Sequence, residues 1–200
     1  MSLFRRTRQN EAPTGLGSRL RGNDRKRTAD VFGIPIESLS LLEIIQKIET
    51  VNNPLWIVTT NPEILLEAER DTAYAQTLRQ ADLRIVDGFG LWLIGRLFGQ
   101  RWSRVTGVEL AEKLIQFAAE KHWRVALLGG YKNVAQLSVE KWKKEYPNLS
   151  IASEQGGQVT KEGVDDDQGE EARHRLTMVA PDVLLIAFGH PKQERWIARY

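Results

Sequence analysis

Cysteine is absent from this sequence of 200 residues. The absence excludes a disulfide framework, a zinc site with thiolate ligands and a cysteine nucleophile. No run of about 18 consecutive apolar residues occurs, so no segment is predicted to span a membrane. Residues 1–6 also lack the apolar core of a secretory signal. Together these absences predict a cytoplasmic chain.

Several catalytic and metal-binding patterns are missing as well. No G-x-G-x-x-G follows a predicted strand and no P-loop motif occurs, which weakens NAD-binding and NTPase interpretations. No G-x-S-x-G elbow supports a hydrolase. The three histidines, His122, His174 and His190, lack metal-ligand spacing. The acidic residues 165–167 lie away from any predicted strand end, so we interpret them as a solvated loop and expect no metal.

Positive charge is concentrated in the first 30 residues. They hold eight basic and three acidic side chains, a net charge of +5, whereas the rest hold 20 basic and 23 acidic side chains, a net charge of −3. Because residues 1–30 also show almost no apolar periodicity, we expect a disordered basic leader. Such an arm can contact anionic lipid or nucleic acid. We favour a solvated extension and expect no nucleic-acid partner.

Residues 31–200 show the alternation of short apolar runs and amphipathic segments that is typical of an α/β domain. The apolar runs are uninterrupted, as the strands of a fully buried parallel sheet require. Helical spacing follows them, for example over 41–51 after Ser40, a candidate N-cap. The pattern predicts a Rossmann-like parallel sheet with helices on both faces. Its strands are predicted at 55–59, 83–87, 124–128, 149–152 and 182–188.

Polar or glycine-rich segments follow four of these strands, at 59–61, 87–90, 129–131 and 189–194. Ligands of open parallel sheets bind beyond the carboxyl ends of the strands. We therefore expect these four segments to bind a polar ligand.

Asp87 stands where a strand passes into Gly88, so its carboxylate can act as a general base on a hydroxyl group. The alternative is that Asp87 caps the following turn. Gly129 and Gly130, between a strand and a helix, allow close approach of a phosphate to the backbone. The alternative there is a tight turn that requires positive φ.

The remaining candidates each have a structural alternative. Thr59 and Asn61 can bind a sugar or nucleotide, although the residues alone favour helix capping for Asn61. Arg104 can pair with a diphosphate or remain a solvated charge. Gln193 and Glu194 begin the last predicted helix and can contact a ligand. The alternative for Glu194 is a favourable interaction of its charge with the helix dipole.

Five motifs occur in a fixed order along the chain. They are T-T-N-P-E at 59–63, V-D-G-F-G at 86–90, R-V-T-G-V-E-L at 104–110, L-G-G at 128–130 and F-G-H-P-K-Q-E-R-W-I at 188–197. The set resembles the WecG/TagA/CpsF family of bacterial glycosyltransferases over about residues 31–200. The resemblance implies transfer of a sugar, of the N-acetylmannosamine type, from a UDP-sugar to a polyprenyl-diphosphate-linked acceptor. It also implies a place at the inner membrane surface, in the synthesis of teichoic acid and other envelope polysaccharides.

The resemblance also implies roles for the candidate residues. Asp87 would deprotonate the acceptor hydroxyl in a single displacement that inverts the anomeric configuration, without a metal or other cofactor. Glu109 stands where the family pattern has Asp. The residues expected to bind substrate are Thr59, Asn61 and Gln193 for the sugar and acceptor, Arg104 for the diphosphate, Gly129 and Gly130 for the nucleotide, and their neighbours Gly88, Thr106 and Glu194.

Members of this family typically continue past the segment at 192–194 with a further strand and a basic appendage. We therefore expect this sequence to lack the C-terminal end of the family domain.

The alternative function is that of a truncated, inactive nucleotide-binding protein with the same fold. An NAD-dependent oxidoreductase is a third interpretation. We also expect the protein to associate peripherally with the membrane and to form a homo-oligomer.

Overall fold

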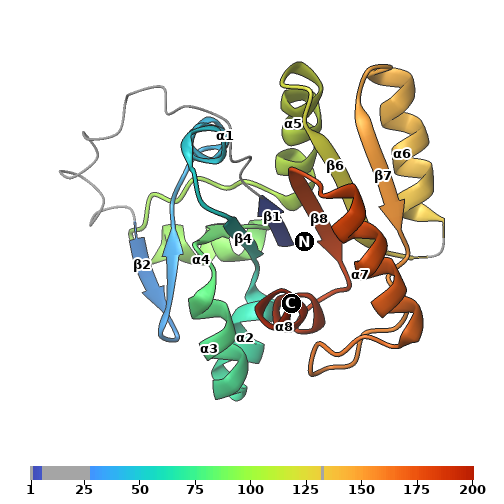
Figure 1. The fold of residues 1–200 in the computed structure, drawn as a ribbon. Helices are drawn as coiled ribbons and strands as arrows, with labels where there is room; N and C mark the ends of the chain where they lie inside the picture. Colours follow the sequence, from blue (N-terminus) through green and yellow to red (C-terminus); the bar gives the residue numbers. More distant parts are fainter. Residues whose placement is uncertain (1, 6–27, 132) are drawn as a thin grey trace. The chain divides into compact units, whose positions relative to one another are not determined.

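The computed structural model describes residues 2–5, 28–131 and 133–200. Strands alternate with helices, which confirms the predicted α/β fold (Figure 1). The chain forms two compact units, one made of Met1–Arg6 with Ala111–Tyr200 and the other of Thr7–Leu110. Each unit is described by itself below.

In the unit formed by Thr7–Leu110, the described residues form four strands in the order β2-β3-β5-β4. The first two form an antiparallel hairpin, and β5 pairs in parallel with both β3 and β4. The strands are β2 (Thr28–Val31), β3 (Ile34–Glu37), β4 (Leu55–Thr60) and β5 (Leu83–Val86). The helices are α1 (Leu41–Thr50), α2 (Pro62–Arg70), α3 (Thr72–Gln80) and α4 (Phe89–Leu97).

Local sequence signals account for the helix starts in this unit. Ser40 forms the predicted cap of α1 in a full capping box with Glu43. Asn61 and Asp71 cap α2 and α3 through their side-chain oxygens. All residues of β4 and β5 are buried, including Arg84, whose guanidinium lies 2.7 Å from a carboxylate oxygen of Glu37. The charge of Arg84 is thus paired inside the unit.

The described part of the other unit has four strands in the order β1-β8-β6-β7. The strand β6 pairs in parallel with β7 and β8, and β1 runs antiparallel to β8. The strands are β1 (Ser2–Arg5), β6 (Arg124–Gly129), β7 (Ser150–Glu154) and β8 (Val183–Ala187). The helices are α6 (Val134–Glu145), α7 (Asp167–Val179) and α8 (Lys192–Arg199), and α5 (Gly107–Glu120) contains the boundary between the units.

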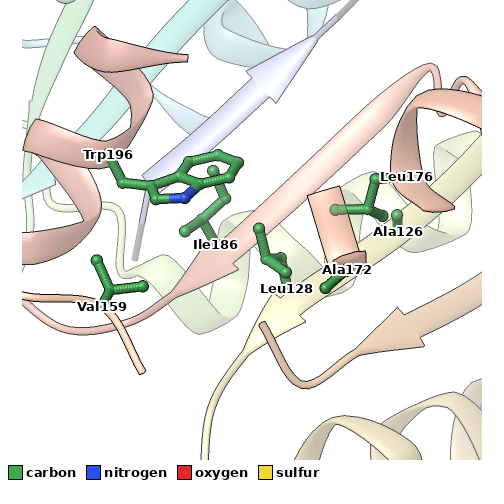
Figure 2. Packing of buried hydrophobic residues seen from close by; sticks show 7 residues of the cluster. All are labelled: Ala126, Leu128, Val159, Ala172, Leu176, Ile186 and Trp196. Carbon is green, nitrogen blue, oxygen red and sulfur yellow. The ribbon is translucent and has the colours of Figure 1, made fainter. Parts of the chain in front are cut away.

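A hydrophobic cluster holds α7 and α8 to the strands of this unit. Figure 2 shows Ala172 and Leu176 of α7 beside side chains of β6, with Trp196 of α8 near Ile186. Full burial of a valine, leucine or isoleucine side chain contributes about 1.5–3 kcal/mol. The cluster consists of Ala126, Leu128, Val159, Ala172, Leu176, Ile186 and Trp196.

The first residues of the expected leader differ from the prediction of disorder. Ser2–Arg5 forms β1, in which Leu3 is fully buried and Arg5 stacks on the ring of Trp123 at 4.5 Å. Pairing with β8, about 180 residues away in sequence, stabilises this strand, and such distant pairing leaves no local pattern. Thr28–Val31 likewise forms β2. The remainder of the expected leader, residues 6–27, lies outside the described residues.

Candidate active site

Asp87 directly follows β5 in the unit formed by Thr7–Leu110, as the sequence predicted. Its backbone N–H donates to the carbonyl oxygen of Thr60 at 2.8 Å, which fixes Asp87 beside the end of β4. Gly88 then adopts φ +78° and ψ 155°, a conformation open essentially only to glycine. A Cβ atom added to Gly88 would meet nothing within 4 Å, so backbone conformation rather than space requires glycine here. Asp87 itself is half-buried.

The start of α5 lies against the carboxylate of Asp87. The N–H of Gly107 donates to Oδ2 of Asp87 at 3.3 Å, and the N–H of Val105 donates to the carbonyl oxygen of Val86 at 3.0 Å. A bond from the N–H of Ser103 to the hydroxyl of Ser38, at 2.9 Å, holds the segment before α5. Asp87 thus accepts from a helix start 20 residues later instead of capping its own turn.

Thr106 and Glu109 form a capping box at the start of α5. The hydroxyl of Thr106 accepts from the N–H of Glu109 at 3.2 Å, and Oε2 of Glu109 accepts from the N–H and hydroxyl of Thr106, both at 2.8 Å. These bonds, together with the charge of Arg104, lower the pKa of Glu109. Arg104 is exposed. The substrate roles of Arg104 and Thr106 stay predictions.

The end of β4 carries Thr59 and Thr60, both buried, followed by Asn61. Oδ1 of Asn61 accepts from the N–H of Ile64 at 2.9 Å, which confirms the helix-capping interpretation. Thr60 belongs to the predicted ligand-binding segment 59–61 but not to the individually predicted site residues. Its buried hydroxyl has no hydrogen-bond partner among the described residues, and such an unsatisfied group typically costs about 1–3 kcal/mol. The end of β4 therefore holds a buried polar group whose hydrogen-bonding capacity is not used among the described residues.

Gly129 and Gly130 form a tight turn at the end of β6, in the other unit. Their φ angles are +84° and +93°, which confirms the tight-turn interpretation. A Cβ atom on Gly129 would lie 2.6 Å from the ring of Phe188, so the close packing also requires glycine. The N–H of Gly130 donates to the carbonyl oxygen of Ala187 at 2.9 Å. The turn is fixed to the end of β8.

A cleft of about 390 Å³ opens beyond the carboxyl ends of β6 and β7. A second glycine pair, Gly156 and Gly157, follows β7 with positive φ angles. This pair is not among the predicted site residues, although it repeats the signal of two glycines after a strand. The cleft is lined by Gly129, Tyr131, Asn133, Ala135, Gln136, Ser153, Glu154, Gln155, Gly156, Gly157, Gln168, Glu171 and Arg175.

Charged side chains meet on one wall of this cleft. Nη2 and Nε of Arg175 lie 3.0 and 3.1 Å from Oε2 of Glu154, the last residue of β7. Nη1 of Arg175 lies 3.6 Å from Oε2 of Glu171, one turn earlier on α7. Hydrogen bonds and charge from Glu154, and then from Glu171, raise the pKa of Arg175. Both contacts of the Arg175 guanidinium to Glu154 are made to Oε2. They hold this carboxylate in place.

Gln193 and Glu194, at the start of α8, are buried and bonded inside the same unit as the cleft. Gln193 accepts from the N–H of Gly189 at 3.2 Å and donates to Oε1 of Glu194 at 2.7 Å. The hydroxyl of Ser2 donates to that same oxygen at 3.0 Å. Both side chains thus tie α8 to β1 and to the turn after β8. Their contact with substrate stays a prediction.

The acidic residues 165–167 differ from the predicted solvated loop. Asp165 accepts from the indole N–H of Trp196 at 2.6 Å and pairs with Arg173 at 3.1 Å. Asp166 caps α7, and bonds from the N–H groups of Gln158 and Gly169 lower its pKa. Two of these carboxylates therefore organise the start of α7. No group of three potential metal ligands occurs among the described residues.

Comparison with known proteins places the chain in a class of enzymes. Residues 29–200 match the model of the Glycosyl transferase WecG/TagA/CpsF family. The chain therefore belongs to this glycosyltransferase family, as its five motifs indicated.

The chain is similar to curated relatives from Staphylococcus aureus. These proteins, from strains NCTC 8325 / PS 47 and COL, are each named N-acetylglucosaminyldiphosphoundecaprenol N-acetyl-beta-D-mannosaminyltransferase. The identity is 30% over 182 residues, which represent 87% of this chain and 69% of each relative.

Proposed function

We propose that this glycosyltransferase moves N-acetylmannosamine from UDP-N-acetylmannosamine to an N-acetylglucosaminyl-diphospho-polyprenol acceptor. The names of the relatives support the sugar and the acceptor. The observation that carries the chemistry is the half-buried carboxylate of Asp87, held at a strand end by the N–H of Gly107. The product would be a lipid-linked disaccharide for envelope polysaccharides such as teichoic acid.

Asp87 would serve as the general base. Its Oδ2 accepts from Gly107, so Oδ1 can accept from the acceptor hydroxyl. As that oxygen attacks the anomeric carbon, its proton passes to Asp87, the bond between the anomeric carbon and the phosphate oxygen breaks, and UDP leaves. A single displacement of this kind inverts the anomeric configuration. Gly88, the next residue, carries no side chain that could hinder this approach.

The UDP group of the donor would occupy the cleft beyond β6 and β7. Its volume of about 390 Å³ lies within the usual range for small-molecule sites, about 300–1,000 Å³. The parallel unit β6–α6–β7 has glycines at its first turn and Glu154 at the end of its second strand. In dinucleotide-binding folds, this arrangement places phosphate at the glycine turn and ribose hydroxyls at the acidic residue. We assign the diphosphate to Gly129 and Gly130 and the ribose to Glu154.

The other expected residues keep their roles within this proposal. Arg104 would pair with the leaving diphosphate as negative charge develops on it. The sugar and acceptor would contact Thr59, Asn61, Gly88, Thr106, Gln193 and Glu194. The proposal uses no metal, because the guanidinium and backbone N–H groups supply the positive charge that UDP requires.

The test combines turnover with donor binding. Wild type should transfer N-acetylmannosamine from UDP-N-acetylmannosamine to the lipid-linked acceptor. Asp87→Asn should lower kcat by about 100-fold to 10,000-fold, the usual contribution of a general base, while the Kd for UDP in calorimetry stays unchanged. Glu69→Gln, which changes an exposed carboxylate on α2 of the same unit, is the matched control.

Three results would contradict this proposal. Retained activity in Asp87→Asn would show that another group is the base. UDP binding without transfer by wild type would favour the inactive nucleotide-binding protein, and NADH binding in place of UDP would favour an oxidoreductase.

A further inference from the structure

The helix α4 leaves most of its apolar side chains exposed. Inside the unit it buries only a narrow stripe, Leu91 and Gly95, and a Cβ atom on Gly95 would collide with the ring of Trp102. Exposed apolar groups of this density are unusual for a soluble monomer and indicate an interaction surface. The exposed fractions are 62% for Phe89, 40% for Leu93, 46% for Ile94, 77% for Leu97 and, just after the helix, 80% for Phe98.

Positive charge accompanies this apolar surface. Between Asp87 and Glu109 the sequence has no acidic residue and three arginines, Arg96, Arg101 and Arg104, all of them exposed. The guanidinium of Arg96 lies 5.5 Å from the ring of Trp92. Residues 88–108 therefore have a net charge of +3, whereas residues 31–200 as a whole have a net charge of −3.

We propose that residues 89–104, the α4 surface, dock on an anionic lipid bilayer. Aromatic and aliphatic side chains enter the boundary between headgroups and acyl chains, and the arginines pair with lipid phosphates. No helix in the described part of the chain is long and apolar enough to cross a membrane, so the contact we propose is peripheral. The α4 surface begins two residues after Asp87, and docking would bring this strand end to the bilayer. That consequence rests on the proposed function, in which the acceptor is a membrane lipid.

Charge selects the bilayer over a second copy of the chain. Two α4 surfaces that face each other in a symmetric dimer would bring together two sets of three arginines with no carboxylate between 88 and 108 to pair with them. Like charges at short range oppose such an interface. An anionic leaflet supplies the missing negative charge over the whole surface.

Vesicle flotation of the full chain tests this inference. Wild type should bind vesicles of equal parts phosphatidylglycerol and phosphatidylcholine, and bind pure phosphatidylcholine more weakly. Leu97→Gln with Phe98→Gln should lower binding to the anionic vesicles by at least about tenfold, because two apolar side chains no longer enter the interface. Arg96→Gln with Arg101→Gln should lower binding to anionic vesicles selectively and reduce its sensitivity to salt.

The matched control is Leu137→Gln with Met178→Gln, which changes two exposed apolar residues, 61% and 75% exposed, on α6 and α7. It should bind vesicles like wild type, and circular dichroism should show every variant folded. Unchanged vesicle binding by both α4 variants would overturn the proposal. A switch from dimer to monomer in these variants with unchanged vesicle binding would overturn it too, and would assign the surface to self-association.

Activity measurements separate this inference from the proposed function. The α4 variants should transfer sugar to a water-soluble short-chain acceptor like wild type, and lose activity only toward acceptor embedded in vesicles. An equal loss toward both acceptors would contradict membrane docking. Absence of transfer in wild type would refute the function alone, because flotation measures docking without turnover.

Discussion

The assignment of the ribose to Glu154 leads to a quantitative prediction for Glu154→Gln. A carboxylate that accepts hydrogen bonds from ribose hydroxyls forms charge-assisted bonds, worth about 1.5–3 kcal/mol. Since 1.4 kcal/mol corresponds to a tenfold change in Kd, the substitution should weaken UDP binding by about 10-fold to 150-fold. Calorimetric titration of the folded chain with UDP measures this change directly.

The same substitution should affect stability much less. The ion pair between Glu154 and Arg175 is partly exposed, with side-chain exposures of 22% and 51%. Such pairs contribute about 0–1 kcal/mol. We therefore expect a shift of only a few degrees in Tm, and a large loss of UDP affinity in a protein that remains folded.

Glu171→Gln is the matched control, because Glu171 contacts the same guanidinium and lines the same cleft but is 73% exposed. It should retain UDP affinity. Wild type should also bind 2′-deoxy-UDP more weakly than UDP, and Glu154→Gln should discriminate less between the two ligands. Equal effects of the two substitutions, or full discrimination by Glu154→Gln, would refute the assignment of the ribose to Glu154.

Two further predictions concern positions that the structure explains directly. Gly88→Ala should lower the free energy of unfolding by about 1–3 kcal/mol, because φ +78° with ψ 155° is strained for alanine even though no atom would clash. Gly90→Ala, where φ is not positive, should cost less in a thermal melt, and an equal cost would contradict a backbone origin. Asp166→Asn should make unfolding less sensitive to acid. The pKa of Asp166 is lowered in the folded state, so its contribution to stability is present above the ordinary value of 3.8 and disappears as the pH falls through the lowered value. Denaturant unfolding of wild type and variant between pH 5 and about pH 2 checks this, and parallel curves would contradict it.

Local chemistry made much of the fold predictable. Uninterrupted apolar runs located β4, β5, β6 and β8, because strands buried on both faces need no polar alternation. Ser40 and Asn61 were identifiable as caps, since a short polar side chain before an apolar periodic segment satisfies free N–H groups. The position of Asp87 followed from the same reasoning, because a strand that ends in Asp-Gly exposes its last side chain at the sheet edge.

Long-range contacts account for what the sequence did not reveal. The pairing of β1 with β8 and the stacking of Arg5 on Trp123 join segments far apart in the chain, so a basic, irregular stretch contributes a buried strand. The partner of Asp87, Gly107, lies in the motif at 104–110, which pointed to Arg104 as a diphosphate contact and gave no sign of a bond to Asp87. Asp165 became a structural residue through Trp196 and Arg173, neither of which is its neighbour in sequence.

Glu194 shows why residue type alone did not define a role at the start of α8. An acidic residue in a first helical turn is usually a solvated group that interacts with the helix dipole. Here the carboxylate is fully buried and accepts from Gln193 and from Ser2, a residue of the expected leader. A buried carboxylate needs such donors, because the loss of hydration otherwise costs several kcal/mol. The N-terminal strand therefore supplies a hydrogen bond to the segment at 188–197, one of the five family motifs, and helps to fix the geometry of that motif.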